Sequence, residues 1–218
     1  MATRLYFDPT NTPDVSPAYS SQWALTADAV RRKMYLDTPG DTASSNFTVA
    51  ETAAVARYVL AVQFVSEPLN AYTENMDLWQ WAFRCMENAA KADAKIVCYL
   101  RKCDGDGANP VDLGINLHGT ECDDVELVNR FVSVGYLTGG EVSQGDRLII
   151  EVGFYLNNTK TDSYSGTVNI TDNHATTDLP ENDTETAAYN CWAETGATFT
   201  EASGEPAAIK LGPMFAFA

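Results

Sequence analysis

Apolar and polar positions alternate along several stretches of this chain, a pattern typical of β-strands with one buried face. In residues 76–86, the odd positions from 79 to 85 carry two tryptophans, a phenylalanine and a cysteine, which an extended chain places on one side. Residues 147–155 repeat the pattern with four apolar residues at even positions, while Arg147 and Glu151 fall on the other side. Both stretches are predicted to be strands that bury their apolar side.

Other stretches have the composition of strands, and helix signals are few. The further predicted strands are rich in Val, Ile, Tyr and Phe and comprise residues 57–65, 95–102, 125–134 and 166–170. Good helix formers occur only in the short stretches 52–57 and 87–93, each long enough for one turn. Many short strands separated by turn residues favour a mostly β fold, an antiparallel two-sheet sandwich of jelly-roll type.

The sequence shows no internal repeat and no low-complexity linker. A single β-sandwich domain over residues 1–218 is therefore the simplest prediction, with extended arms at 1–20 and 205–218. Both ends carry apolar, strand-like residues, which could pair with the sandwich itself or with a neighbouring subunit by strand addition. The second alternative makes these residues candidate inter-subunit contacts: Leu5, Tyr6, Phe7, Phe215 and Phe217.

Acidic residues outnumber basic ones, with 30 Asp and Glu against 14 Lys and Arg and a net charge of −16. Such a charge repels phosphate, so direct binding to nucleic acid or to an anionic membrane is disfavoured, while a basic protein partner or bound cations fit better. The N-terminus has no apolar core of signal-peptide length, and no apolar stretch approaches the roughly 20 residues that span a bilayer. We expect a protein made in a cytoplasm that does not enter a membrane.

Candidate catalytic chemistry is sparse. The histidines His118 and His174 lie among turn residues, and neither belongs to a recognisable nucleophile, phosphate-binding or metal motif. Glu151 and Glu126 could in principle face each other as a glycosidase pair, but outward acids on strands are more often solvated. The sequence therefore predicts no enzyme activity, no catalytic residues, no metal and no cofactor.

Two further features have a structural and a binding interpretation. Residues 104–109 look like a calcium loop, but the glycine spacing is wrong and no glutamate follows at the twelfth position, so a hairpin turn with an acidic tip is favoured. Trp79 and Trp81 share their face with another aromatic residue, which favours core packing over stacking on sugars. Tyr155 is the aromatic residue left freest to contact a sugar.

Short segments of moderate specificity extend over nearly the whole chain, at residues 15–18, 23, 29–33, 64–69, 84–87, 145–153, 165–167, 178–184 and 192. In these segments the chain resembles a family of small, uncharacterised structural proteins encoded by tailed phages and prophages. The resemblance implies a virion component without catalytic residues. The chain departs from the family pattern at Cys191, where a proline is usual, and in a longer C-terminal stretch over residues 193–218, which suggests added contacts with neighbours.

The resemblance and the strand pattern together predict a capsid decoration or cement protein, located in the virion, that stabilises the head by bridging capsid subunits. Its expected partners are the major capsid protein or other virion proteins, and we expect a homo-oligomer within the particle, where repeated contacts strengthen attachment. An alternative is a tail, neck or baseplate component with a receptor- or carbohydrate-binding role. A third alternative, from another class, is a β-sandwich hydrolase acting on cell-surface glycans.

Five cysteines cannot all pair within one chain, and reduced, buried thiols are the default in a cytoplasmic protein. A virion leaves the reducing cell, so thiols at subunit contacts could then oxidise. We therefore predict at least one inter-subunit disulfide, with candidate cysteines Cys98, Cys103, Cys122 and Cys191.

Overall fold

The computed structural model describes residues 3–36, 44–51, 55–73, 78–135, 141–157, 163–171 and 177–202. Within these ranges the chain forms eleven strands: β1 (Thr3–Phe7), β2 (Val30–Tyr35), β3 (Ser44–Glu51), β4 (Arg57–Ser66), β5 (Leu78–Glu87), β6 (Ala94–Cys103), β7 (Val111–Leu117), β8 (Val128–Gly135), β9 (Arg147–Leu156), β10 (Tyr164–Thr171) and β11 (Trp192–Thr195). The described ranges contain no helix, and hence none with the length and apolar character of a membrane span.

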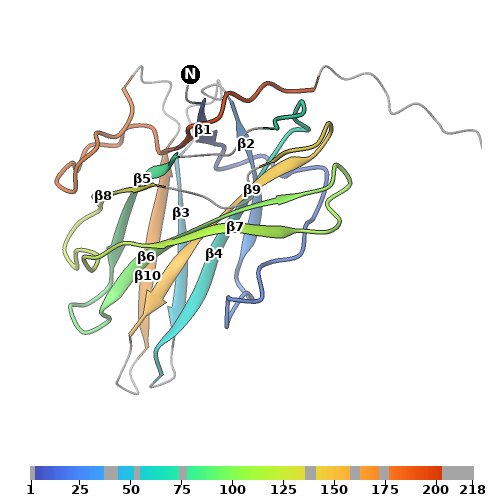
Figure 1. Cartoon of the computed structure of the whole chain (residues 1–218). Coiled ribbons are helices and arrows are strands. Elements are labelled where there is room, and N and C mark those ends of the chain that lie inside the picture. The colour runs from blue at the N-terminus through green and yellow to red at the C-terminus, as the bar shows by residue number, and fades with distance from the viewer. Residues whose placement is uncertain are drawn as a thin grey trace, which may run out of the picture.

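The strands form two layers packed face to face (Figure 1). One layer has the order β3-β10-β5-β8, and the other has the order β4-β9-β6-β7, extended at one edge by β2. Strands β1 and β11 lie between β2 and β5 and join the two layers along one side. Because each layer alternates strands from the two halves of the chain, this is the jelly-roll arrangement. The predicted mostly β, two-sheet sandwich is confirmed.

The sequence predicted antiparallel pairing throughout, and this part of the prediction is wrong for one pair of strands. Strands β2 and β4 pair in parallel, with Val30 opposite Val62 and Met34 opposite Ser66. Strand β3, in the opposite layer, lies between them in the chain, so the chain re-enters this layer running in its earlier direction. Two parallel neighbours need such a crossover, since a tight hairpin joins only antiparallel strands.

Aromatic side chains fill the space between the layers. Phe7 packs against Phe64 and Phe83, with ring centroids 4.6 Å and 5.0 Å apart. Trp79 and Trp81 are fully buried, which confirms their predicted place in the core. Such aromatic contacts dominate the apolar area that a sandwich buries, and they hold the layers at a fixed spacing.

The N-terminal strand belongs to its own sandwich. Strand β1 pairs with β11 on one side and β2 on the other, and Leu5 and Phe7 are almost completely buried. Tyr6 is half-buried and donates a hydrogen bond of 3.0 Å to Asp178 Oδ2. The prediction that these three residues contact another subunit is therefore wrong for Leu5 and Phe7, whose side chains are not accessible. Phe215 and Phe217 lie outside the described residues.

The other predicted end segments also need revision. Residues 8–29 are not a free arm but cross the outer face of the β4-β9-β6 layer, while 205–218 lie outside the described residues. The helical turn predicted at 87–93 is a single hydrogen-bonded turn without a helix, in which the Ala92 amide donates to the Ala89 carbonyl, while Glu87 still belongs to β5. Of the other predicted turn, 52–57, residues 52–54 are outside the description and Arg57 begins β4.

Candidate binding site

A second, smaller apolar cluster covers the outer face of the β4-β9-β6 layer. Trp23 packs there on Leu60, Val97 and Tyr99, and its ring centroid lies 4.8 Å from that of Tyr99. Gly153 makes this close approach possible, because a Cβ at that position would lie 2.8 Å from the Trp23 ring. The layer is therefore buried on both faces, by the main core on one side and by residues 8–29 on the other.

Glu151 is enclosed beneath this segment and has no exposed surface. Its carboxylate accepts hydrogen bonds from Trp23 Nε1 at 2.6 Å and from Gln63 Nε2 at 2.8 Å. It also accepts from Arg101 Nη1 at 2.8 Å and from the Ser20 amide at 3.2 Å. A buried carboxylate is tolerated when donors of this kind satisfy its oxygens.

The expectation that Glu151 is a solvated charge is wrong, and the structure does not form the suggested glycosidase pair. Glu151 lies under the outer face of one layer, with both oxygens engaged. Glu126 is exposed just ahead of β8, which belongs to the other layer. The two carboxylates therefore do not flank a common cleft.

Arg101 connects this buried carboxylate to the surface. Its Nη1 also donates to the Ala18 carbonyl at 2.7 Å, and its Nε donates to Asp112 Oδ1 at 2.5 Å. The second oxygen of Asp112 accepts from the Ser20 hydroxyl at 3.2 Å. Because the Asp112 side chain is 45 % exposed, the network ends in a fixed carboxylate that faces solvent.

A bulge in β7 brings Asp112 and Ile115 to the same face. The pairing with β6 shifts between Leu100 and Arg101, so that Leu113 is an extra residue in β7 and turns into the core. Without the bulge, strand alternation would place residues 112 and 115 on opposite faces. Here Asp112 stands opposite Arg101, and Ile115 opposite Tyr99, both on the outer face.

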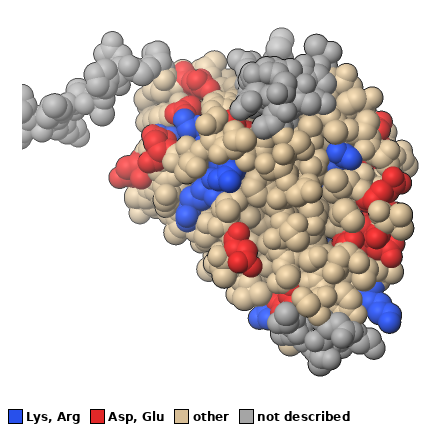
Figure 2. All heavy atoms as spheres, turned by 180° about the vertical axis from the view of Figure 1, so that it is seen from behind, with Lys and Arg blue, Asp and Glu red and all other residues tan. Residues whose placement is uncertain are grey.

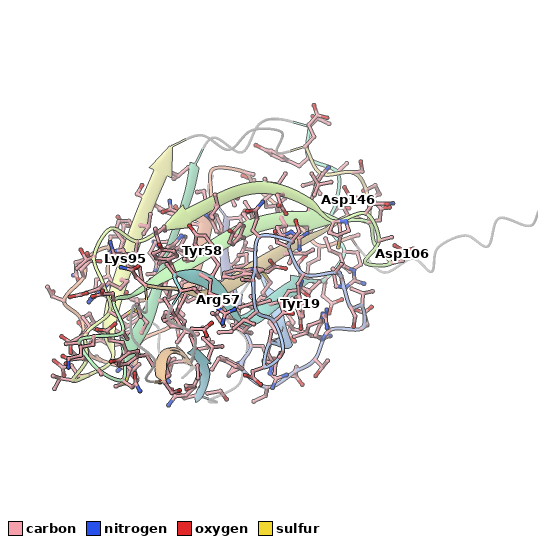
Figure 3. All side chains as sticks on the ribbon, turned by 90° about the horizontal axis from the view of Figure 1, so that it is seen from below. Tyr19, Arg57, Tyr58, Lys95, Asp106 and Asp146 are labelled. Carbon is pink, nitrogen blue, oxygen red and sulfur yellow. The ribbon has the colours of Figure 1, made fainter. Side chains whose placement is uncertain are left out.

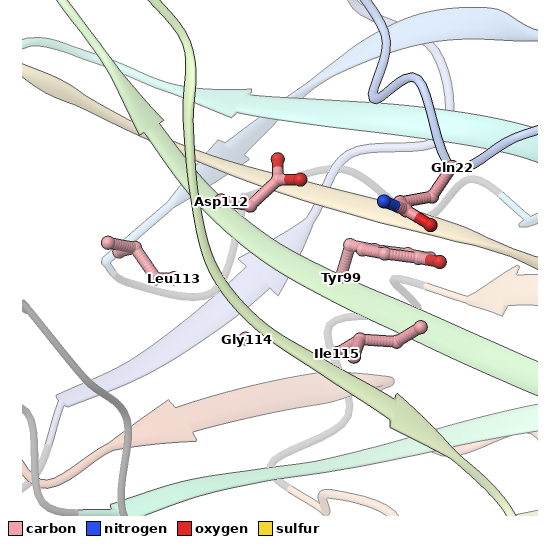
Figure 4. A pocket seen from close by; sticks show the side chains of 6 residues that line it. All are labelled: Gln22, Tyr99, Asp112, Leu113, Gly114 and Ile115. Atoms are coloured by element: carbon pink, nitrogen blue, oxygen red, sulfur yellow. The ribbon is translucent and has the colours of Figure 1, made fainter.

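These residues line a pocket of about 320 Å³ on the outer face (Figure 4). Its wall combines polar and apolar groups: Gln22, Tyr99, Asp112, Leu113, Gly114 and Ile115. The Tyr99 ring lies between the side chains of Gln22 and Ile115. The volume is at the lower end of the range for small-molecule sites, roughly 300–1,000 Å³.

Tyr99 is the unusual member of the pocket. Its side chain is 2 % exposed, and its hydroxyl has no hydrogen-bond partner among the described residues. Burial raises the pKa of this phenol, with smaller contributions from nearby Tyr58 and the carboxylates of Asp112 and Glu151, so it is a neutral donor. A buried hydroxyl without a partner is costly to the fold, which makes it a candidate contact for a ligand.

Strand β7 is also the apolar edge of the sandwich. Among the described residues β7 pairs only with β6, and three of the five exposed large hydrophobic residues lie on it: Val111, Ile115 and Leu117, at 49 %, 50 % and 38 % exposure. The other edges differ. The exposed positions of β3 are small or polar, and in β8 the Phe131 amide donates to Asp183 of a covering loop at 2.8 Å.

Acidic residues lie at both ends of β7. The β6–β7 hairpin carries Asp104 and Asp106, and the far end is followed by Glu121 and Asp124. The hairpin is the turn predicted for residues 104–109, closed by hydrogen bonds between Asp104 and both Gly107 and Ala108.

Figure 3 shows Asp106 and Asp146 at one end of the sandwich, and Tyr58 and Lys95 toward the other. On the face seen from behind, uncharged residues predominate (Figure 2).

The two histidines considered as catalytic candidates do not form a catalytic group in the described part of the chain. His118 is buried, with Nε2 3.2 Å from Asp183 Oδ2 and Nδ1 2.9 Å from the Thr120 carbonyl, while His174 lies outside the described residues. Among the described residues no group of three or more His, Cys, Asp and Glu side chains could hold a metal ion.

The candidate disulfide residues Cys98, Cys103, Cys122 and Cys191 are buried, so an inter-subunit bond through any of them requires local opening. The inter-subunit disulfide stays a prediction.

Comparison with known proteins identifies no family, since no family model and no curated protein matches the chain. Among solved structures, an α-amino acid ester hydrolase is similar with a TM-score of 0.50 and 8 % identity, over 89 % of this chain and 36 % of that one. A CocE/NonD family hydrolase from Staphylococcus aureus follows at 0.46 and 10 %, over 89 % and 36 %. A structure of infectious bursal disease virus, Gx strain, gives 0.34 and 8 %, over 71 % and 33 %.

This comparison corrects the prediction that the protein has no enzyme activity. A structure of the same fold belongs to an ester hydrolase, so a chain of this architecture occurs within an enzyme, and missing sequence motifs do not exclude catalysis. The chain spans about a third of the length of that hydrolase, which is covered over 36 %. At 8 % identity the likeness establishes the fold and leaves the activity to be argued from the chain's own residues.

Proposed function

We propose that this chain is a structural protein of a phage particle that attaches to a neighbouring shell subunit through strand β7. The observation that carries the proposal is the apolar edge of β7, which in the described part of the chain pairs only with β6 and has Ile115 and Leu117 exposed on its outer face. Natural proteins usually protect such an edge, because it invites pairing with another chain. The resemblance of the sequence to phage structural proteins supports the same role, and a capsid decoration protein is its most specific form.

The chemistry of the edge defines the partner. A strand added to β7 would gain main-chain hydrogen bonds from the free edge and would cover the aliphatic side chains. The acids at both ends of β7 and the net charge of −16 favour a partner strand flanked by Lys or Arg. We therefore expect a basic rim around an apolar strand on the shell subunit.

Placing lysines on β7 should abolish attachment without unfolding the sandwich. In the double variant Ile115→Lys and Leu117→Lys, two charges would have to be buried in the interface, and affinity should fall at least about 30-fold. The measurement is co-sedimentation of the purified chain with particles from which it has been deleted. A matched control places lysines at the exposed positions of the other edge, Thr48→Lys and Ala50→Lys in β3, and should bind normally. Equal binding by both double variants would reject the β7 interface.

A second candidate function is the binding of a small, uncharged polar ligand such as a monosaccharide, which fits a receptor- or carbohydrate-binding role. The Tyr99 hydroxyl favours this function, since it is buried and has no hydrogen-bond partner among the described residues. The pocket also offers the Gln22 amide and the Asp112 carboxylate. Sugar hydroxyls both donate and accept, and each of these groups can pair with one. Ile115 supplies an apolar surface for the ring carbons.

The variant Tyr99→Phe tests the role of this hydroxyl in the free protein and in a complex with a monosaccharide. In the free protein the substitution should raise stability by about 1 kcal/mol, because it removes a buried polar atom without a partner. If a monosaccharide binds there, the same variant should weaken its binding about tenfold, measured by calorimetry against a panel of neutral hexoses and pentoses. The absence of binding by any member of the panel to the wild-type chain would eliminate this candidate and leave the β7 proposal unaffected.

A further inference from the structure

Two cysteines meet inside the molecule where the strand pattern alone does not join them. Cys85 is near the end of β5, and Cys122 lies in the connection between β7 and β8. Their Sγ atoms are 3.2 Å apart, and both side chains are buried. A disulfide has an S–S distance of about 2.05 Å, so a small rotation of the side chains would bring the sulfurs to bonding distance.

A backbone bridge lies directly beside the two cysteines. Met86 and Asp123 form a parallel bridge, and the Glu87 amide donates to the Asp123 carbonyl at 2.9 Å. Cys85 and Cys122 each stand one residue before that bridge, so the bridge holds the two segments that carry them against each other. In the sheet itself Cys85 stands opposite Val128 and Val168, so the observation that favours this pair is the 3.2 Å contact between the two sulfurs.

We propose that Cys85 and Cys122 are a modification site that forms an intrachain disulfide when the chain meets a disulfide oxidant such as oxidised glutathione. This pairing differs from an inter-subunit bond, because both sulfurs belong to one chain and are covered by it. It also does not depend on attachment through β7, since the geometry involves only residues of the sandwich.

The exchange proceeds in two balanced steps. The thiolate of one cysteine, after losing its proton to water, attacks a sulfur of oxidised glutathione, and one glutathione thiolate leaves. The second cysteine, also deprotonated, then attacks the mixed disulfide and expels the second glutathione. The two cysteines lose two protons and two electrons in total, and one glutathione disulfide becomes two glutathione thiols.

Burial controls when the reaction can occur. Enclosure raises the pKa of the Cys85 thiol, and its contact with Cys122 adds to the effect, so the folded protein holds few reactive thiolates. The bond should therefore form during folding or local opening in an oxidising medium. Once formed, it would tie β5 to the segment ahead of β8, enclosing β6 and β7 in a covalent loop.

The test is refolding of the full chain from denaturant in a buffer of oxidised and reduced glutathione, where access to the thiols is not limiting. After quenching with acid, free thiols are alkylated under denaturing conditions and the intact mass is measured. Of the five cysteines, three should be alkylated, and peptide mapping should find Cys85 joined to Cys122. The melting temperature should rise by about 5–10 °C and return to its former value with a reductant.

Variants make the result specific. Cys122→Ala and Cys85→Ala should each leave all remaining thiols open to alkylation, whereas Cys103→Ala, a buried cysteine outside the pair, should still form the bond. Cys191 also influences the Cys85 thiol electrostatically and is the natural competitor. Alkylation of all five thiols in the refolded wild-type chain, a bond from Cys85 to Cys191, or a disulfide-linked dimer would each overturn the proposal.

Discussion

Replacing Glu151 with alanine is expected to lower the free energy of unfolding by about 3–5 kcal/mol, because it leaves a buried arginine without its main partner. Arg101 has only 5 % of its side chain exposed, and Asp112, at the surface, would be its remaining carboxylate. Trp23 and Gln63 would lose their acceptor at the same time. The measurement is urea denaturation at neutral pH.

The control is Glu126→Ala, which removes the same charge from an exposed position and should change stability by no more than about 0.5 kcal/mol. Glu151→Gln should fall between the two, since the amide can still accept from Trp23 but presents an uncharged group to Arg101. If Glu151→Ala is as stable as Glu126→Ala, the carboxylate is not enclosed as the structure has it, and the wall of the pocket is incorrectly placed.

Adding a single methyl group at Gly153 should destabilise the protein by about 3 kcal/mol. A Cβ there would lie 2.1 Å from the Val59 carbonyl oxygen and 2.9 Å from the Leu60 Cα, both backbone atoms that cannot rotate away. It would also lie 2.8 Å from the Trp23 ring, so the segment over the outer face would lift. Thermal unfolding monitored by circular dichroism measures the loss.

Gly119→Ala provides the matched control for this substitution. A Cβ at Gly119 meets no atom within 4 Å, so the stability of that variant should stay within about 0.5 kcal/mol of wild type. If Gly153→Ala has the same melting temperature as Gly119→Ala, the N-terminal segment does not pack against β9. Lowered stability of Gly153→Ala with an unchanged pocket would contradict the packing of Trp23 on Tyr99, because displacing the Trp23 ring should also alter the pocket wall.

Alternation and strand composition in the sequence predicted β4, β5, β6, β8, β9, β10 and the inner core, whereas β2, β3, β7 and β11 were not predicted. The odd positions of residues 79–85 and the even positions of 148–154 do face the interior. The order of the strands was not readable, because pairing between β3 and β10 or between β4 and β9 joins residues far apart in the chain. Neither local propensity nor turn residues carry that information.

The outer face of the second layer was misinterpreted for a physical reason. Period two separates the two sides of a strand but does not say whether something covers the second side. On β9 that side carries Ile149 beside Glu151, and on β6 it carries Val97 and Tyr99, which are too apolar for a solvated face. That mixed composition is the signal that residues 8–29 return to cover it.

The bulge in β7 was likewise invisible in the pattern. Residues 111–117 were not predicted to be a strand, and it is the extra Leu113 in that strand that places Asp112 and Ile115 together and so creates the pocket. Predicting Leu5 and Phe7 as external contacts failed for the opposite reason. A chain end near apolar residues can pair with its own sheet or with a neighbour, and only the three-dimensional arrangement decides between them.

A jelly roll supports many functions, so the fold does not choose between a shell protein and part of an enzyme. Our proposal of a shell protein rests on β7, whose edge has no second partner strand among the described residues and whose exposed aliphatic side chains distinguish it from β3 and β8. Hydrogen bonds from Arg101 connect the buried Glu151 to Asp112 at the surface. This network ties the β6–β7 pair to residues 8–29.

The most direct measurement is an image reconstruction of the intact particle by electron cryomicroscopy. We expect the chain to be present in many copies, with β7 beside a strand of a neighbouring protein and with Ile115 and Leu117 covered. Particles that lack the chain, or copies in which β7 faces solvent throughout, would contradict this expectation.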